Sequence, residues 1–502
     1  MQHLNVTYGP TRVLLEVPKE AGIMGQSLFN NIRSRIDKPL TSWVRDGQHW
    51  KPGSKFYIED DKKRIISVPV YYFKDRLRHE LKMLGINLIT KRADIDVPEN
   101  SYVINPSYKD REDQIELLTY LEKRKGLCTV VEGDTGFGKT YCTIRIGSVF
   151  KETTLVVAPS LTKQWMKEAR KITTLVDEHD VYEIAGYKSI ADLYKLKIKP
   201  KLIIASPKTM LKYVEYEGEY KKNVPPYSQF IKDFSIGTKI IDEVHYGFAT
   251  TAKIDLAGDV RTNIYLSATM HQSNSSMLTI FNGMLPPQIR YITDLQHPHT
   301  VHIQWKYPKL VAPARAKFQG SYSQVAYEKA LCRGNFRGLR YLVNHDLIPA
   351  IDKFFIAKRK TTDQLGEENI SSQRCLIFFN NKKTIREVVR LLRIKYGEVW
   401  TINHYLGGDP QSNLYESDMC VATITGAGIG KDIPNLLTII NGVSHASKIW
   451  AIQTRGRLRY TPNQLTYMVD LYSADFKTMY KHLMKRVRYL KGRLYNYLTI
   501  ST

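Results

Sequence analysis

Residues Thr129 to Thr140 read Thr-Val-Val-Glu-Gly-Asp-Thr-Gly-Phe-Gly-Lys-Thr, and this stretch decides the fold of the chain. Its β-branched start is typical of a buried parallel strand, and the glycines let backbone N–H groups approach an anion closely. The spacing GxxxxGK[ST] from Gly133 to Thr140 is typical of a loop that binds phosphate groups ahead of a helix. We therefore expect a strand, a phosphate-binding loop and a helix, in that order.

The residues of this loop have separate expected roles. Lys139 would contact the β and γ phosphates of a nucleoside triphosphate, and the hydroxyl of Thr140 would ligate Mg²⁺. The expected nucleotide-binding residues of the loop are Gly133, Asp134, Thr135, Gly136, Phe137, Gly138, Lys139 and Thr140. ATP and Mg²⁺ are therefore the expected cofactors.

A second motif, Ile240-Ile241-Asp242-Glu243-Val244-His245, follows about a hundred residues later, at the end of an apolar strand. Asp242 is placed to hold the same metal ion, directly or through water, and Glu243 to orient and deprotonate the attacking water. Taken alone, acidic residues after a strand usually form a solvated turn. Together with the phosphate loop they indicate a protein that hydrolyses a nucleoside triphosphate.

Composition favours a polyanionic partner. The chain has 502 residues, with 74 Lys and Arg against 49 Asp and Glu, which gives a formal net charge of +25. Such an excess favours nucleic acid, because each neutralised phosphate releases condensed counterions. The 32 Tyr and 16 Phe add surfaces on which bases could stack, although most such rings in any protein belong to the core.

Cysteine usage and hydropathy favour a cytoplasmic protein. The five cysteines show neither CxxC pairing nor zinc-ligand spacing, and they are interpreted as reduced thiols. No stretch approaches the apolar length of a membrane span, and the N-terminus lacks the pattern of a secretion signal. We therefore expect no membrane association and a location in the cytoplasm, which is the host cytoplasm if a phage encodes the chain.

The order of predicted elements indicates an α/β protein of three domains. Residues 1–100 are predicted to form a small basic α/β domain with a DNA-binding or accessory role, followed by a linker at 98–106. Apolar strands then alternate with helices through 101–310, the nucleotide-binding domain, and again through 311–502, so two doubly wound parallel sheets are expected in tandem. A stretch rich in Lys, Tyr and Glu, from Tyr213 to Lys232, is predicted to be an exposed excursion.

Further segments follow the same motif order. They are Arg111-Glu112-Asp113-Gln114, Ala158 to Trp165, Ala205 to Leu211, Ser267-Ala268-Thr269, Arg374 to Thr384, Thr423 to Pro434 and Gln453 to Arg459. This order resembles that of the superfamily 2 helicases and translocases of the DExH type over about residues 105–475. Ser447-Lys448-Ile449, the small basic N-terminal domain and the basic helix Tyr480 to Tyr489 are similar to the phage UvsW-type branched-DNA helicases, whose relatives RecG and XPB act on duplex DNA.

The resemblance implies two RecA-like domains and assigns further roles. Gln114 would read the adenine edge and Asp432 would contact the sugar, while His245, Ser267, Thr269 and Gln453 would couple hydrolysis to movement. Arg457 and Arg459 would act as arginine fingers, which stabilise charge on the γ phosphate and raise rates by about 10³ to 10⁵. The family spaces its last motif differently and Tyr460 stands at the expected final arginine, so Arg457 is the preferred finger.

The expected contacts to nucleic acid come from small polar residues. Thr162, Thr209, Asn381 and Thr423 would bind the phosphates of one strand, although each is equally ordinary as a helix cap. Two basic stretches, Arg333 to Arg340 and Lys481 to Arg493, suit either a nucleic-acid track or a solvated helix face.

The leading hypothesis is a monomeric ATP-dependent DNA helicase or translocase that unwinds and remodels forked or branched DNA. Branch migration, fork processing, recombination and repair are the expected settings, with replication or recombination proteins as partners. Two alternatives stay open, an RNA helicase or RNP remodeller, and an ATP-gated junction-binding factor without processive unwinding.

Overall fold

The computed structural model describes residues 2–46, 49–133, 136–159, 162–177, 179–215, 224–245, 247–268, 270, 275–293, 298–359, 373–427, 433–458, 464–473 and 476–501. Contacts divide the chain into two compact units. The first comprises Met1–Gly133 and Phe137–Asp294, and the second has Leu295–Thr502 as its continuous part. Within the described ranges, no helix combines the length and apolar character that crossing a bilayer requires.

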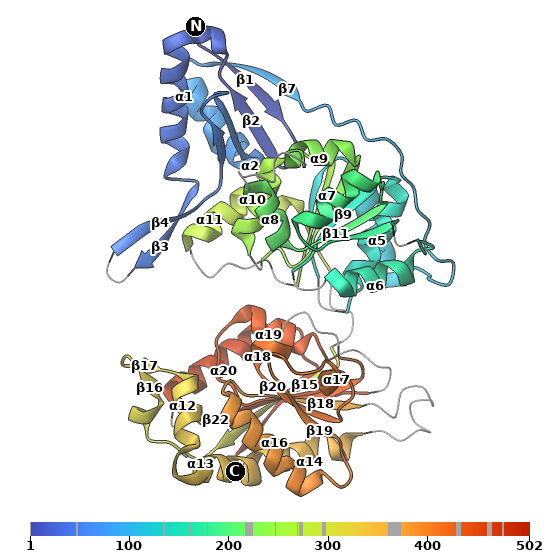
Figure 1. The fold of residues 1–502 in the computed structure, drawn as a ribbon. Coiled ribbons are helices and arrows are strands. Elements are labelled where there is room, and N and C mark those ends of the chain that lie inside the picture. Colours follow the sequence, from blue (N-terminus) through green and yellow to red (C-terminus); the bar gives the residue numbers. More distant parts are fainter. Residues whose placement is uncertain are drawn as a thin grey trace. The chain divides into compact units, whose positions relative to one another are not determined.

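The N-terminal module is built on a mixed sheet (Figure 1). Across the sheet its strands are β5 (Ile58–Asp60), β6 (Ile65–Pro69), β2 (Arg12–Glu16), β1 (His3–Tyr8) and β7 (Asn87–Arg92). Strands β1 and β7 run parallel, and the other neighbouring pairs are antiparallel. Helix α1 (Gly22–Asp37) buries Leu28, Phe29 and Ile32 at helical spacing, and the hairpin of β3 (Thr41–Asp46) and β4 (His49–Lys55) follows it.

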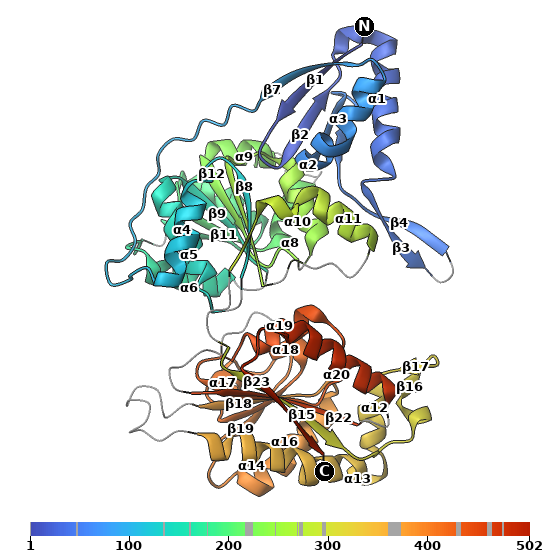
Figure 2. The same cartoon turned by 180° about the vertical axis from the view of Figure 1, so that it is seen from behind.

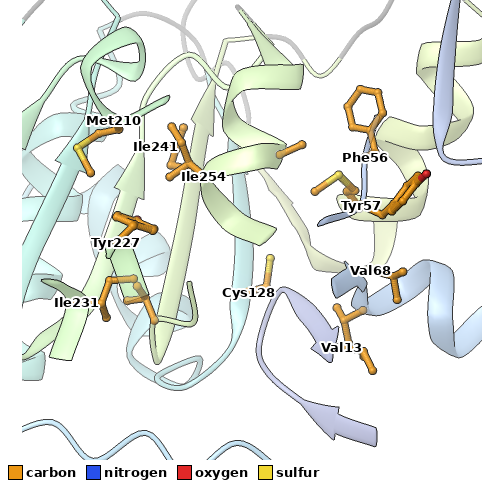
Figure 3. Close-up of a cluster of buried hydrophobic side chains, with 14 of the residues drawn as sticks. Val13, Phe56, Tyr57, Val68, Cys128, Met210, Tyr227, Ile231, Ile241 and Ile254 are labelled. Atoms are coloured by element: carbon orange, nitrogen blue, oxygen red, sulfur yellow. The ribbon is translucent and has the colours of Figure 1, made fainter. Parts of the chain in front are cut away.

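The module shares its core with the parallel-sheet domain that follows it in the first unit. One buried apolar cluster runs without a break from the module's strands to the helices of that domain, and Figure 3 shows side chains from both parts. Phe56 stacks on Phe248 with ring centroids 5.6 Å apart. Arg12 forms an ion pair of 3.0 Å with Asp259, and both side chains are largely buried. Apolar burial and a buried ion pair therefore fix the module to the domain.

The domain of the first unit is a seven-stranded parallel sheet with helices on both faces. In spatial order its strands are β10 (Val181–Ile184), β11 (Leu202–Ala205), β9 (Thr153–Val157), β12 (Ile236–Ile241), β13 (Thr262–Ser267), β8 (Cys128–Glu132) and β14 (Arg290–Ile292). Neighbouring strands are all parallel.

Successive strand residues bury toward opposite faces of this sheet. Val131 and Ile240 join the cluster beneath α4 (Glu112–Glu122), α5 (Lys139–Phe150) and α6 (Thr162–Ile172). Their neighbours Val130 and Ile241 join the other cluster, and α4, α5 and α6 can be followed from behind in Figure 2. That second face is covered by α7 (Tyr187–Leu196), α8 (Pro207–Glu215), α9 (Tyr227–Asp233), α10 (Phe248–Ala257) and α11 (Ser275–Met284). Both faces being buried explains why the strands are continuous apolar runs.

The second unit repeats this architecture. Its parallel strands, in spatial order, are β19 (Ile402–Tyr405), β20 (Met419–Ala422), β18 (Arg374–Phe378), β21 (Leu436–Asn441), β22 (Thr466–Ser473), β15 (Thr300–Tyr307) and β23 (Asn496–Ser501). Its helices include α12 (Gln324–Leu331), α13 (Arg333–Leu342), α14 (Ile348–Phe354), α16 (Lys382–Tyr396), α18 (Ile424–Ala427), α19 (Lys448–Arg455) and α20 (Lys477–Leu490). The predicted fold class, two doubly wound parallel sheets plus a small N-terminal α/β domain, is confirmed. Strand β15 already belongs to the second sheet, although it precedes residue 310.

The exposed excursion predicted from Tyr213 to Lys232 is wrong for its described parts. Tyr213, Tyr227 and Phe230 are buried, and their rings pack edge-to-face around Tyr213. The sequence suggests exposure because lysines and glutamates surround these rings, but α8 and α9 turn the aromatic residues inward. Residues 216–223 lie outside the described residues.

The segment predicted as a linker packs along the domain. Tyr102 is buried and its hydroxyl donates to the carbonyl oxygen of Ile144 at 2.8 Å. Asn100 donates to Thr153 Oγ1 at 2.8 Å, and Ile104 forms a bridge with Thr173. The prolines break regular structure here without freeing the backbone from the domain surface.

One cation of the predicted C-terminal basic track is internal. Arg486 on α20 is 1% exposed and donates from Nε to Asp470 Oδ2 at 2.9 Å. Asp470 also accepts hydrogen bonds from His302 and Asn441, both at 2.8 Å. Arg486 and His302 hold the pKa of Asp470 below its usual range against the opposing effect of burial. Arg486 therefore belongs to the core of the second unit.

Candidate active site

Three neighbouring strands of the first sheet place the predicted site at one edge. Strands β12, β13 and β8 lie side by side and run parallel, so their carboxyl ends meet. The phosphate loop follows β8, the acidic pair follows β12, and β13 ends at Ser267. The Gly133 N–H donates to the Ser267 carbonyl oxygen at 3.0 Å, and the Val244 N–H donates to that of Leu266 at 3.1 Å. The three motifs thus form one continuous backbone network.

The described part of the phosphate loop leads directly into helix α5. Gly138 caps the helix with φ +90°, a left-handed conformation that favours glycine, and no side chain among the described residues caps the first turn. Lys139, the first helical residue, extends back so that Nζ donates to the Gly133 carbonyl oxygen at 2.5 Å. A helix N-terminus with a lysine beside it suits a phosphate group. Asp134 and Thr135 lie outside the described residues.

Gln114 lies against this loop. Its Nε2 donates to the Phe137 carbonyl oxygen at 3.0 Å, and its Oε1 accepts from the Arg111 N–H at 3.1 Å in a capping box that begins α4. Arg111 donates to the same Phe137 oxygen at 2.6 Å. The structure therefore places Gln114 beside the nucleotide loop, and its adenine contact stays a prediction.

Asp242 is buried at the end of β12 and held by two donors. Trp165 Nε1 donates to Oδ2 and the Glu243 N–H donates to Oδ1, both at 3.0 Å. Burial and the neighbouring Glu243 together raise the pKa of Asp242 to about 6, against the opposing effects of Trp165 and Lys139. A buried carboxylate that is costly to ionise alone fits a site for a cation. With the hydroxyl of Thr140 it offers the oxygen donors that Mg²⁺ prefers.

Glu243 and His245 form a contact chain toward β13. Glu243 has φ +49°, a left-handed conformation that is costly for a residue with a side chain and is often found at functional sites. His245 Nδ1 lies 2.7 Å from Ser267 Oγ and 3.3 Å from Glu243 Oε2. Burial lowers the pKa of His245 to about 4, so the imidazole is neutral at pH 7. Close polar contacts thus connect Glu243 through His245 to Ser267, and the contact between His245 and Ser267 is a hydrogen bond.

Two residues at this edge had no predicted role. Trp165 lies within a motif segment, but its indole contact with Asp242 spans 77 positions and only the fold reveals it. Glu132, the last residue of β8, accepts from the Met270 N–H at 3.1 Å, while its carbonyl oxygen accepts from the Thr293 N–H at 2.9 Å. Glu132 therefore ties the phosphate-loop strand to the segment after Ser267. In the sequence, only its position directly before Gly133 indicated that Glu132 lies beside the phosphate loop.

The residues predicted to bind nucleic acid lie at helix starts. Asn381 Oδ1 accepts from the Lys383 N–H at 2.8 Å as the cap of α16, and Thr423 Oγ1 accepts from the Gly426 N–H at 3.0 Å. In the first turn of α8, the hydroxyl oxygen Oγ1 of Thr209 lies 2.9 Å from Ser206 Oγ. Thr162 is the first residue of α6. The capping alternative is observed for Asn381 and Thr423, and contact with phosphates stays a prediction for all four.

The remaining predicted residues belong mostly to the second unit. Gln453 lies buried in α19 and Arg457 follows the helix, 5% exposed. Thr269, Asp432 and Arg459 lie outside the described residues. The arginine-finger and sugar-contact roles therefore stay predictions.

A parallel sheet whose first strand ends in a phosphate loop, with an acidic pair two strands away, defines the class of P-loop nucleoside triphosphate-binding domains. Residues 111–278 match the family model of the DEAD/DEAH box helicase, so the chain is similar to that family over this stretch. The predicted resemblance to the superfamily 2 helicases is thereby confirmed over these residues.

Other known proteins are similar over different extents. The probable helicase D10 of Escherichia phage T5 is 27% identical over 177 residues, which are 34% of this chain and 31% of that protein. The chain thus matches about a third of the length of this curated relative.

The fold of this chain is also similar to that of a solved helicase structure, over more of its length than the family model covers. The DEAD-box helicase Mss116, solved with ssRNA and UDP-BeF, is similar over 78% of this chain and 75% of its own, with 15% identity and a TM-score of 0.50. T4 UvsW is aligned over 100% of this chain and 99% of its own, with 13% identity. Its TM-score of 0.35 is too low to support an argument about function.

Proposed function

We propose that the chain is an ATP-dependent DNA helicase or translocase that unwinds and remodels forked or branched DNA. The observation that carries the proposal is the convergence of Lys139, Asp242, Glu243 and His245 at one edge of the first sheet. The domain assignments 1–100, 101–310 and 311–502 belong to this proposal, with the boundary at 310 moved ahead of β15, as do a monomeric state and a cytoplasmic location.

The side chains of the site divide the work of hydrolysis. Lys139 binds the β and γ phosphates, and Thr140 and Asp242 hold Mg²⁺, which supplies neutralising charge on the phosphate oxygens when it is bound. Glu243 accepts a proton from the attacking water. His245 and Ser267 pass changes at Glu243 to the end of β13, where Glu132 also holds the segment after Ser267.

The second unit contributes the arginine in this proposal. Arg457 stabilises charge on the γ phosphate, with Arg459 as a second cation, and Gln453 couples this contact to movement. Gln114 and Asp432 recognise the adenosine part of ATP. Thr162, Thr209, Asn381 and Thr423 contact the backbone of one strand.

The net charge of +25 and the basic N-terminal module support nucleic acid as the substrate, and we propose that this nucleic acid is DNA. An RNA helicase is the second candidate, because the family match names no polymer. Replication or recombination proteins are the proposed partners.

The test measures ATP hydrolysis and strand displacement over matched single-stranded, duplex, forked and four-way DNA and RNA at stated salt. Lys139→Ala and Glu243→Gln should lower both activities by at least 10²-fold, since each removes a group that acts on the phosphates or on water. Lys188→Ala, an exposed lysine on α7, is the matched control and should leave both unchanged. Hydrolysis that needs no nucleic acid and survives both changes would refute the proposal.

A further inference from the structure

A basic groove lies between the N-terminal module and the parallel-sheet domain, within the first unit. Its cavity measures about 790 Å³. Six cationic side chains line it, and its lining contains no Asp or Glu among the described residues. The cations are Lys74, Arg78, Lys91, Arg92, Arg124 and Arg261. A second hollow of about 430 Å³ shares Arg78 and Thr90 with it and adds Lys82.

Regular structure places the exposed cations of this groove. Lys74 and Arg78 are four positions apart in the continuous helical segment Val70–Met83, so they share one face. Lys91 and Arg92 end β7, the strand at one edge of the module's sheet. The helix and the strand thus bring four cations to the lining of the groove.

These four cations differ from the other two in their partners. Arg124 donates to Thr129 Oγ1 at 2.7 Å and to the Cys128 carbonyl oxygen at 2.9 Å, and Arg261 pairs with Glu152, so both stabilise the domain. Among the described residues, no carboxylate pairs with Lys74, Arg78, Lys91 or Arg92, and all four are exposed. Lysines and arginines on an ordinary solvated surface usually lie far apart. A concave site lined by charges of one sign focuses the positive electrostatic potential, which attracts a polyanion.

The groove is separate from the nucleotide site. Cys128, the first residue of β8, lines it, whereas the phosphate loop follows the last residue of the same strand. At roughly 3.3 Å per residue, a five-residue strand separates the two sites by about 15 Å. The groove therefore lies at the amino-terminal edge of the sheet, and the motifs at the carboxyl edge do not reach it.

We propose that this groove binds the phosphate backbone of nucleic acid, as a contact additional to those of the motor motifs. The proposal rests on the proposed function, because it names where the N-terminal module holds the polymer. Backbone phosphates carry the chemistry that four unpaired cations neutralise, and Tyr71, above which Lys74 Nζ lies 5.6 Å from the ring centroid, adds an aromatic surface.

The first test compares two variants with the same change in net charge. Lys74→Ala/Lys91→Ala/Arg92→Ala removes three groove cations, and Lys19→Ala/Lys38→Ala/Lys62→Ala removes three exposed lysines of the module that do not line the groove. Binding of labelled single-stranded and duplex DNA and RNA is measured by fluorescence anisotropy between roughly 50 and 200 mM salt. Over this range the logarithm of the affinity falls in proportion to the number of phosphate contacts.

The groove variant should bind at least tenfold more weakly than the control variant. Its slope of log K against log salt should fall by about 2 to 3, since each lost duplex phosphate contact contributes about 0.9. Equal affinities and slopes in the two variants would overturn the proposal. If the unchanged protein binds none of the four polymers, the proposed function itself fails.

A second measurement needs no variant and so does not depend on folding. Acetylation of lysines in the unchanged protein, followed by mass spectrometry, should show Lys74 and Lys91 protected severalfold when nucleic acid is bound. Lys19 and Lys62 should react equally with and without it. Unchanged reactivity of Lys74 and Lys91 under saturating nucleic acid would contradict the groove and leave the helicase proposal standing.

Discussion

At the scale of the residue, Trp165 shows how one hydrogen bond sets the charge of a site. Its indole N–H donates to Asp242 at 3.0 Å and opposes burial and Glu243, which raise the pKa of this carboxyl group to a net value of about 6. In Trp165→Phe this donor is lost, so the pKa of Asp242 rises and the carboxylate ionises only at higher pH. We expect the acid limb of ATP hydrolysis to move up by about one pH unit, which corresponds to about 1.4 kcal/mol.

The matched control for this change is Trp305→Phe, which removes an indole donor 3.1 Å from Asp346 in the second unit. It should cost stability and leave the acid limb in place. The measurement is kcat of ATP hydrolysis against pH for the unchanged protein, Trp165→Phe and Trp305→Phe. An acid limb that does not move in Trp165→Phe would show that Asp242 is not the group that titrates there.

His445 makes the stability of the second unit depend on pH. Burial, together with the nearby Arg486 guanidinium, lowers its pKa to about 3. In the unfolded chain the value is about 6.5, so the unfolded state takes up the proton first as pH falls. The stabilisation is therefore complete above about pH 6.5 and is lost on the way down toward pH 3.

The corresponding variant is His445→Asn, with urea unfolding measured at pH 7.5 and 5.0. Between these pH values the free energy of unfolding of the wild type should fall by up to about 2 kcal/mol more than that of the variant. From about pH 6.5 down to pH 5.0 only the unfolded state takes up the proton, and each pH unit of this interval contributes about 1.4 kcal/mol. His245, whose pKa burial lowers to about 4, is present in both proteins and cancels. Parallel losses in the two proteins would exclude His445 as the source.

At the scale of the element, the start of α5 depends on the absence of a side chain. Gly138 has φ +90°, and a Cβ there would lie 2.3 Å from Gln114 Nε2. Gly138→Ala should therefore displace Gln114 from the loop and weaken ATP binding by more than tenfold. Gly22→Ala is the control, since φ is +53° and nothing lies within 4 Å of the added carbon. It should cost about 1 kcal/mol and leave ATP binding unchanged, as titration with a fluorescent nucleotide would show.

Elements that carry their own local signal could be predicted from the sequence. The apolar strands β9, β11 and β13 are buried on both faces, so composition alone marks them, and the loop at Gly133 fixes the start of α5. Elements whose burial depends on distant partners could not be predicted. Tyr213 and Tyr227 are surrounded by charged residues in sequence, and their burial follows from their packing against each other.

The same distinction applies to the candidate site. Lys139 and Asp242 were predicted because each stands at a fixed offset within a motif. Trp165 was not assigned, because its contact joins helix α6 to the turn after β12 across 77 positions of the chain. Arg486 was expected among surface cations, and its burial depends on Asp470 from another element.

At the scale of the whole molecule, the N-terminal module is held to the domain by a continuous core and few polar contacts. Arg12 is central, because it pairs with Asp259 at 3.0 Å and donates to the Leu256 carbonyl oxygen. Gly9 approaches the same carboxylate so closely that a Cβ there would lie 2.1 Å from Asp259 Oδ1. Removing Arg12 would leave Asp259 buried without its charge partner.

The last prediction concerns this contact. Arg12→Ala should lower the free energy of unfolding of the first unit by about 2 kcal/mol, because breaking a largely buried pair costs more than breaking an exposed one. Arg33→Ala is the control, since its pair with Glu59 lies within the module and the arginine is 41% exposed, so the loss should stay below about 1 kcal/mol. Urea unfolding gives both values, and limited proteolysis at 93–101 should be faster in Arg12→Ala alone. Equal stability and equal cleavage in the two variants would mean that apolar burial, and not the Arg12 pair, fixes the module to the domain.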